Sequence, residues 1–494
     1  MSAASPAQRS GQRPARGPFT RWLRRSRGGQ GRWVLADQAV VSGSNFLIGI
    51  LLARQLGPEA FGTYVLLQAV MLYVNSYQGA LIFQPLLSTA PQLPEAPRRR
   101  YLEGAYALQL LLAGALAALT LLIGLLVALI TASVPGLPRF SPGGLVAIPA
   151  LALALCAFQM LDWQRRILFV NARSHQALGL DLCAYGLQGG LLLALAALDL
   201  LSVATAFFAI ASGCAVAWLM FGKPLAWLGK GAATLHGDGI DPSPAALLRP
   251  VWDHAREVLA RSWRNSRDYL AAWQFQWVGS QGVLVVGAGL IGAHAAGGVR
   301  AAQNIIGPVN LLFQAMENVV PINAARRYAA GGLPGLSAYL WRTTAAGSVL
   351  LLPLLGALAL WSLPLTRVLY GERYAAYASL VMWQALSIFL QFYLRQGFFF
   401  LRTVGATGAV LGAGVVMACV AVGVALATVR SLQASGVMFA FLAGYAAALF
   451  WTAVAVARAA NAAKAAKAKN AKNAKNAKNA KNAKNATTTG REAG

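Results

Sequence analysis

The chain has 494 residues, of which 57% are hydrophobic and only 12% are charged, and its mean hydropathy is +0.54. Soluble proteins carry about 25% charged residues, so this composition excludes a soluble globular protein and indicates a polytopic α-helical membrane protein. The net charge of +27 does not indicate nucleic-acid binding, because Lys and Arg lie in the tails and between apolar runs, as in membrane proteins.

We predict twelve transmembrane helices, because apolar runs of about 20 residues, the length that spans a bilayer, recur along the chain. Residues 1–32 form a basic cytoplasmic segment that we expect to be disordered. An N-terminal six-helix bundle follows over 33–222, and a C-terminal six-helix bundle covers 270–457. The predicted spans are 33–53, 61–85, 104–132, 143–163, 176–199, 201–222, 270–290, 294–322, 337–363, 375–396, 404–428 and 436–457.

Two polar segments complete the predicted organisation. Residues 223–269 form a cytoplasmic linker in which a Gly/Pro/Asp cluster, GDGIDPSP, precedes a polar stretch with Trp, Leu and Val anchors. That pattern predicts an interfacial helix, with a partner-docking helix as the alternative. Residues 458–494 repeat Ala-Lys-Asn and contain no apolar residue larger than alanine. We expect this basic tail to be disordered, because it cannot bury a core and its period of three does not match a helix face.

The distribution of basic residues predicts the orientation in the membrane. With both tails left out, the loops on the side of the termini hold 17 Lys and Arg, and the opposite loops hold five. Because short cytoplasmic loops carry the excess of positive charge, both termini are expected to be cytoplasmic.

A short internal repeat suggests that the two halves arose by duplication. Residues 56–69, LGPEAFGTYVLLQA, align without gaps with residues 291–304, IGAHAAGGVRAAQN. The identical pairs are Gly57 with Gly292, Ala60 with Ala295, Gly62 with Gly297, and Gln68 with Gln303. Both stretches fall at the turn between the first two helices of their half, where glycines permit positive φ and close backbone approach. Six spans per half make the repeats parallel.

Three stretches resemble the O-antigen and exopolysaccharide flippases of the multidrug/oligosaccharidyl-lipid/polysaccharide superfamily. DQAVVSGSNFLIGILLARQLGPEAFGTYVL at 37–66 resembles their N-terminal signature. GVRAAQNIIGPVNLLFQAMENVVP at 298–321 is similar to the corresponding second-half motif, and DWQRRILFVNARSHQALGLD at 162–181 to their loop between the fourth and fifth helices. The resemblance covers about residues 33–457, without the Lys-rich tail, and none of the three stretches by itself identifies a substrate.

The resemblance implies two six-helix bundles around a central cavity that opens alternately to each side of the membrane. It implies that the chain flips an undecaprenyl-diphosphate-linked oligosaccharide across the bacterial inner membrane for polysaccharide biosynthesis and export. The expected partners are this lipid-linked oligosaccharide, membrane lipids, and polysaccharide polymerase and chain-length machinery. No enzymatic activity, cofactor or nucleic-acid partner is expected.

Arg300 is the most informative polar residue in the apolar spans. On a helix, Arg300, Gln303, Asn304, Asn310 and Glu317 fall on one stripe. A lipid-facing Arg at a helix centre would cost at least about 2.5–3.5 kcal/mol, so we expect this stripe to line the interior. The guanidinium can form two parallel bonds with phosphate oxygens. The alternatives are an Arg that extends to the membrane interface or pairs with Asp37, Asp268 or Glu317.

Polar residues of the first two spans are further cavity candidates: Asp37, Asn45, Gln68 and Asn75. Amides have both donors and acceptors for sugar hydroxyls, but bonds between helices are an equal alternative for them. Asp162 and Asp181 are expected to pair with Arg165, Arg166 or Arg173. Asp37 or Glu317 could take up a coupling H⁺ or Na⁺, and no Walker ATP-binding loop is present.

Two other functions remain open at this stage. A multidrug or organic-cation antiporter of the same fold would favour buried carboxylates, whereas the stripe here begins with an arginine. A membrane polysaccharide polymerase or ligase would be expected to carry a long periplasmic loop with Arg and His. The predicted periplasmic loops are short, the longest covering about residues 132–143.

Overall fold

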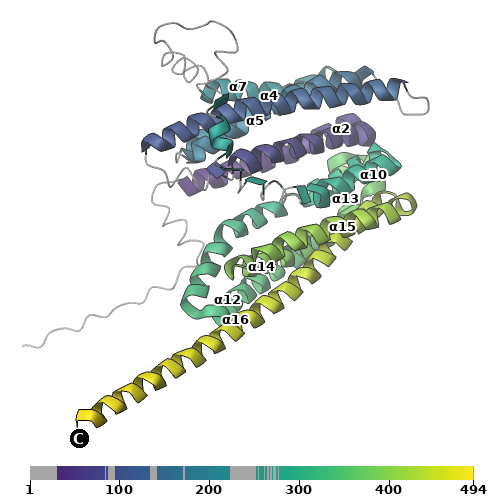
Figure 1. Ribbon diagram of the computed structural model, residues 1–494. Helices are drawn as coiled ribbons and strands as arrows, with labels where there is room; N and C mark the ends of the chain where they lie inside the picture. Colours follow the sequence, from purple (N-terminus) through teal and green to yellow (C-terminus); the bar gives the residue numbers. More distant parts are fainter. Residues whose placement is uncertain are drawn as a thin grey trace, which may run out of the picture.

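The computed structural model describes residues 30–83, 85–86, 95–133, 142–170, 173–222 and 277–492, with short pieces between 252 and 275. The regular elements in these residues are all helices (Figure 1). The N-terminal bundle contains α2 (Gln30–Gln78), the π-helical η1 (Gly79–Phe83), α4 (Glu95–Ser133), α5 (Pro142–Val170), α6 (Ser174–Ala197) and α7 (Val203–Gly222). The C-terminal bundle contains η3 (Val278–Gly282), α10 (Val283–Ile291), α11 (Ala293–Ile306), α12 (Val309–Leu360), α13 (Ser362–Tyr370), η4 (Glu372–Tyr377), α14 (Ser379–Thr403), α15 (Thr407–Leu432) and α16 (Ala434–Glu492).

These elements make the two six-helix bundles that the sequence predicts. Two long helices each contain two spans, because α2 breaks at Gly57 and α12 breaks at Gly332, where the backbone leaves helical geometry. Eight helices of the described residues are long and apolar enough to cross a membrane. Among the remaining spans, Val278–Ile291 is apolar but shorter than 18 residues, whereas α14 is long enough but carries more polar residues. The chain is therefore an all-α, multi-pass membrane protein.

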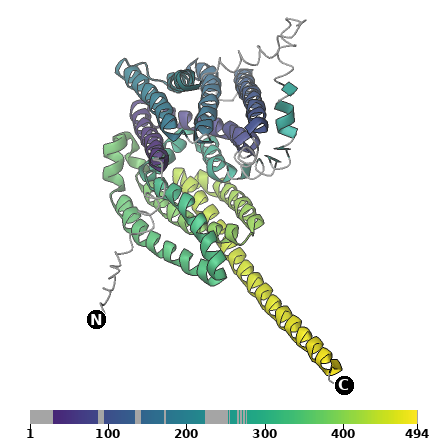
Figure 2. The same ribbon diagram turned by 90° about the vertical axis from the view of Figure 1, so that its left-hand side faces the viewer.

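The two bundles lie side by side, and helix ends gather on two opposite sides (Figures 1 and 2). We call one the turn side, because it holds the breaks at Gly57 and Gly292 and the short turns that follow α6 and α15. The other, which we call the terminal side, holds the start of α2 and the end of α16 (Figure 1).

The glycines of the internal repeat have the geometry that the sequence predicts. Gly57 has φ 74° and ψ 174°, and its repeat mate Gly292 has φ 99° and ψ 161°. A positive φ favours glycine, so both halves turn from their first to their second helix by the same device. A Cβ on Gly62 would overlap the carbonyl oxygen of Ala293, which explains why the crossing of α2 and α11 needs this glycine.

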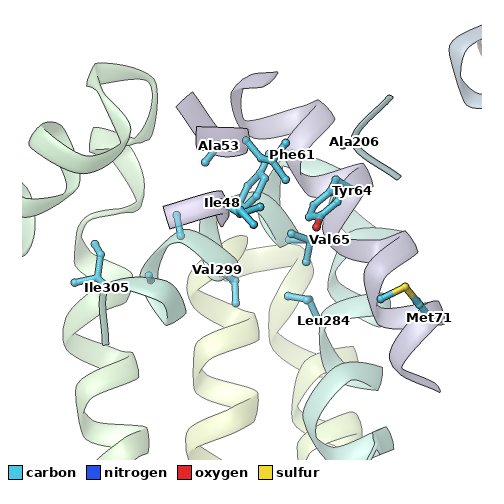
Figure 3. Close-up of a cluster of buried hydrophobic side chains, with 14 of the residues drawn as sticks. Ile48, Ala53, Phe61, Tyr64, Val65, Met71, Ala206, Leu284, Val299 and Ile305 are labelled. Atoms are coloured by element: carbon cyan, nitrogen blue, oxygen red, sulfur yellow. The ribbon is translucent and has the colours of Figure 1, made fainter. Parts of the chain in front are cut away.

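The largest hydrophobic core joins the two bundles. It includes Ile48 and Val65 of α2, Val299 of α11 and Leu284 of α10, all less than a tenth exposed. Figure 3 shows Ile48 and Val65 on the side of α2 that faces Val299. The contact between α2 and α11 therefore positions the polar residues that follow along both helices.

Three segments differ in detail from the prediction or fall partly outside the described residues. The tenth span is not one helix from residue 375, because η4 precedes α14, which begins at Ser379. Residues 1–29 of the predicted N-terminal segment and most of linker 223–269 lie outside the described residues, and residues 30–32 already belong to α2. In the described part of the linker, residues 255–260 are helical, and Ala255 and Val258 are buried in a cluster with Phe83.

The C-terminal segment is helical in the structure, whereas the sequence predicted disorder. Helix α16 continues to Glu492 and extends away from the bundles (Figure 1). Alanine and lysine are good helix formers, and adding a residue to an existing helix is much easier than starting a new one. The prediction of disorder considered only whether the tail has an apolar face. It did not consider that the last transmembrane helix could continue into the tail.

Candidate functional site

A cavity of about 490 Å³ lies between the two bundles. Helix α2 lines most of one wall, α5, α6 and α7 add residues from the same bundle, and α11 and the start of α12 form the wall of the other bundle. The polar or charged lining residues are Ser42, Asn45, Tyr64, Gln68, Tyr185, Gln188, Cys214, Arg300, Asn304 and Asn310. The remaining lining is apolar or glycine, which is typical of small-molecule sites.

Arg300 is the one charged residue among the described residues that line this cavity. Its Nη2 donates a hydrogen bond to Gln68 Oε1 at 3.0 Å, and its Nη1 donates to Gln303 Oε1 at 3.4 Å. No carboxylate in the described part of the chain lies within ion-pair distance of it. Among the described residues, the guanidinium therefore has only neutral acceptors, and it lies at the boundary of the 490 Å³ cavity.

Five of the six predicted amides lie at the cavity or beside Arg300. Asn45, Gln68, Asn304 and Asn310 line the cavity, and Gln303 contributes by accepting the bond from Arg300. The backbone of α2 approaches Asn304 closely, since a Cβ on Gly49 would lie 2.5 Å from Asn304 Nδ2. These side chains converge from both bundles.

The prediction of one continuous polar face along residues 300–317 is wrong. The helix is interrupted at Gly307 and Pro308, between α11 and α12. Proline cannot donate the backbone hydrogen bond that a helix interior needs. Asn310 still reaches the cavity, whereas Glu317 turns to other partners: Arg395 Nη1 donates to its Oε1 at 2.9 Å, and Arg402 Nη1 lies 3.5 Å from its Oε2.

Asp37 is also outside the cavity lining, contrary to the expectation. It is completely buried and accepts a 2.8 Å bond from Arg165, whose Nε lies 2.9 Å from Asp181. The helix face of Asp37 could be read from the sequence, but Arg165 lies 128 residues away. The predicted pairings of Asp181 with Arg165 and of Asp162 with Arg166 (3.0 Å) are confirmed.

Asn75 is the remaining candidate that does not line the cavity. Its Oδ1 is buried and has no hydrogen-bond partner among the described residues. Sequence reasoning missed Tyr64, Tyr185 and Gln188, which all line the site. Gln188 could have been found, because a single amide within the apolar run of α6 has to face a polar surface or another helix.

Comparisons with known sequences do not extend this description. No protein-family model matches the chain, and no curated protein sequence matches it.

Solved structures of membrane transporters do share the fold. A multidrug resistance MATE-family transporter of the MOP superfamily, in an inward-facing conformation, has a TM-score of 0.60 at 14% identity, covering 87% of this chain and 96% of its own. The lipid II flippase MurJ, in an inward closed conformation, has a TM-score of 0.56 at 11% identity, covering 86% of each chain. A MOP-superfamily transporter from Pyrococcus furiosus, described as having a binding pocket of reverse polarity, has a TM-score of 0.52 at 13% identity, covering 86% of this chain and 94% of its own. At these identities the likeness concerns the fold alone, and the chain has the twelve-helix, two-bundle fold of these transporters.

Proposed function

We propose that this protein is a flippase that moves an anionic, lipid-linked oligosaccharide across the membrane by alternating access. The single observation that carries the proposal is that Arg300 is the only charged lining residue among those described and has no acidic partner there. A cationic cavity without a built-in counter-ion favours an anionic cargo. Polyprenyl-diphosphate-linked sugars fit this requirement, and undecaprenyl diphosphate is the carrier that the sequence resemblance implies.

The chemistry of the cavity suits the two parts of such a cargo. A guanidinium offers donors in a planar fork, which matches two oxygens of a phosphate and makes short charge-assisted bonds. The amides of Asn45, Gln68, Asn304 and Asn310 can donate to and accept from sugar hydroxyls. The polyprenyl chain would remain in the surrounding lipid, where it needs no protein site.

The residues that line the cavity also argue against an organic cation as the cargo. Multidrug transporters appear among the solved structures with this fold, but a shared fold does not determine function. An organic-cation antiporter is less well supported, because a cation would meet Arg300 and no lining carboxylate among the described residues. A polymerase or ligase would be expected to carry a long periplasmic loop, and the longest predicted loop on that side covers only about residues 132–143.

The proposal includes H⁺ or Na⁺ as the coupling ion. Of the two carboxylates that the sequence suggested, the contacts favour Asp37 over Glu317. Asp37 and Asp181 are both buried and share a single guanidinium, that of Arg165, so the group has a surplus of negative charge that a cation would balance. Glu317 instead faces two arginines and has no such surplus.

We also propose that the protein lies in the bacterial inner membrane with its terminal side in the cytoplasm. The loops on that side carry most of the Lys and Arg, as cytoplasmic loops do. Cargo would then enter from the terminal side and leave toward the turn side, where the next partners would be polysaccharide polymerase and chain-length machinery.

Substitution of Arg300 tests the proposed function. In a bacterial host that lacks its own O-antigen flippase, the wild-type protein is expected to restore surface polysaccharide. Arg300→Ala should abolish export, and Arg300→Lys should restore it only in part, because lysine lacks the bidentate fork. The measurements are surface polysaccharide and the amount of protein in the membrane.

Arg342→Ala is the matched control, since Arg342 also lies in a membrane span but is exposed on α12, away from the cavity. It should export normally. Full export by Arg300→Ala at normal membrane abundance would contradict the proposal.

A further inference from the structure

The two hydrogen bonds of Arg300 reach different bundles. Gln303 lies on the same helix, three residues further on, whereas Gln68 belongs to α2 of the other bundle. The two glutamines occupy equivalent positions of the internal repeat. One arginine is therefore held by two repeat-related amides, and only the bond to Gln68 joins the two bundles.

This bond lies next to the tightest contact between the bundles. At the crossing of α2 and α11, a Cβ on Gly62 would overlap Ala293 O, and a Cβ on Gly297 would overlap Pro58 O. The two contacts are related by the internal repeat: Pro58 aligns with Ala293, and Gly62 aligns with Gly297, so each glycine meets the repeat mate of the residue that the other glycine meets. Arg300 follows Gly297 by three residues. Any separation of the bundles on the turn side must therefore break the bond between Arg300 and Gln68.

The same bond competes with an anion. A bidentate anion takes two of the five N–H donors of a guanidinium, and Nη1 and Nη2 of Arg300 each already donate one bond to a glutamine. A phosphate group is negatively charged and can accept two parallel bonds from a guanidinium, whereas Gln68 Oε1 is a single neutral acceptor. An anion in the cavity should therefore displace Gln68.

We propose that the hydrogen bond between Arg300 and Gln68 is a latch, which holds the two bundles together on the turn side while the cavity is empty and is released when an anion binds Arg300. The release step rests on the proposed function, because it requires an anionic group at Arg300. The holding step does not. Binding can shift a conformational equilibrium only if it differs between the two states, and displacement of Gln68 supplies that difference.

The test measures the separation of the bundles directly. The four cysteines, Cys156, Cys183, Cys214 and Cys419, are replaced by alanine. Spin labels are attached to Leu200→Cys, between α6 and α7, and to Leu432→Cys, at the end of α15, both of which are exposed on the turn side of different bundles. Double electron–electron resonance then reports the distance in lipid nanodiscs, with and without inorganic pyrophosphate as the probe.

Three variants of the two glutamines are expected to change the distance between the spin labels in different ways. Gln68→Leu should shift the ratio of open to closed populations toward the longer distance by about tenfold, the effect of one hydrogen bond to a charged group. Gln303→Leu is the matched control, which removes the same acceptor from the same arginine within one bundle and should leave the distance unchanged. Gln68→Glu should lock the closed state, because its carboxylate would form an ion pair with Arg300 that pyrophosphate cannot displace.

Pyrophosphate should lengthen the distance in the parent protein and leave Gln68→Leu unchanged. An unchanged distance in Gln68→Leu, or an equal change in Gln303→Leu, would overturn the latch. A parent protein that binds pyrophosphate in calorimetry without a change in distance would overturn the release step. If pyrophosphate does not bind but Gln68→Leu shows the longer distance, the result would contradict the diphosphate cargo and support the holding step. A failure of the proposed function can therefore be distinguished from a failure of the latch.

Discussion

At the scale of single residues, the partners of each arginine indicate what that arginine does. Arg165 lies between Asp37 and Asp181, at 2.8 and 2.9 Å, and its side chain is 19% exposed. Within the described part of the chain, Arg300 has only amide hydrogen-bond partners and lies against the cavity. The first arrangement is a buried ion cluster, in which both carboxylates need the positive charge of Arg165. The second leaves the charge available for a ligand.

Removal of Arg165 should destabilise the protein more than removal of its neighbour. Arg165→Ala would leave two buried carboxylates without a counter-ion, and breaking a buried pair costs about 3–5 kcal/mol. Arg166→Ala removes a guanidinium that is 40% exposed and leaves one carboxylate, that of Asp162, unpaired instead of two, so it should cost less. Thermal unfolding of the purified protein in detergent measures both. Equal melting temperatures for the two variants would contradict the importance of the Arg165 cluster.

At the scale of elements, the crossing of α2 and α11 determines how the two bundles meet. Membrane helices approach closely where small residues lie at the contact, and here Gly62 and Gly297 bring the two backbones together. The core around Val65 and Val299 packs beside the crossing (Figure 3). The closed turn side therefore depends on the absence of a side chain at these two positions.

Gly62→Ala should open this contact. Its Cβ would meet a backbone carbonyl of the other bundle, and neither backbone can move aside without separating α2 from α11. In a cysteine-free background, a reporter cysteine at Val299, which is completely buried, should become accessible to a water-soluble maleimide.

Gly289→Ala is the control for this variant, because a Cβ there would meet nothing within 4 Å. It should leave the Val299→Cys reporter protected. Protection of the reporter in Gly62→Ala as well would show that the crossing can adapt.

At the scale of the whole molecule, the repeat is symmetric in its backbone and asymmetric in its charge. The positive-φ glycines and the crossing glycines occur in both halves. Val65 occupies the position that Arg300 has in the second half, yet Val65 is 2% exposed within the core and does not line the cavity. Among the described residues, only the C-terminal bundle therefore presents a charge to the cavity.

Moving the arginine to the other half should not preserve function. In the double variant Val65→Arg with Arg300→Val, the guanidinium would be buried among apolar side chains, at a large desolvation penalty. We expect less protein in the membrane and no export of polysaccharide. Comparison with Arg300→Val alone separates the two effects, since the single variant should insert normally and fail only in export. Export by the double variant at the wild-type level would mean that the halves are interchangeable.

The sequence by itself determined the class of protein, the spans and the repeat. Apolar runs long enough for a bilayer have few solutions other than helices, and glycines such as Gly57 and Gly292 indicate turns through their own backbone chemistry. These features depend on residues close together in the chain. The same local rules misjudged the tail, because its helix is a continuation of α16 and not an independent element.

Only the tertiary structure decided which polar residues share the site. Helical periodicity gives the face on which a residue lies, but the neighbour of that face depends on how each helix is rotated and packed. Asp37 and Gln68 both lie on α2, yet Asp37 meets Arg165 of α5 and Gln68 meets Arg300 of α11. Those partners are 128 and 232 residues away. The packing of the two bundles brings them together, and the same packing makes Arg300 a contact between them.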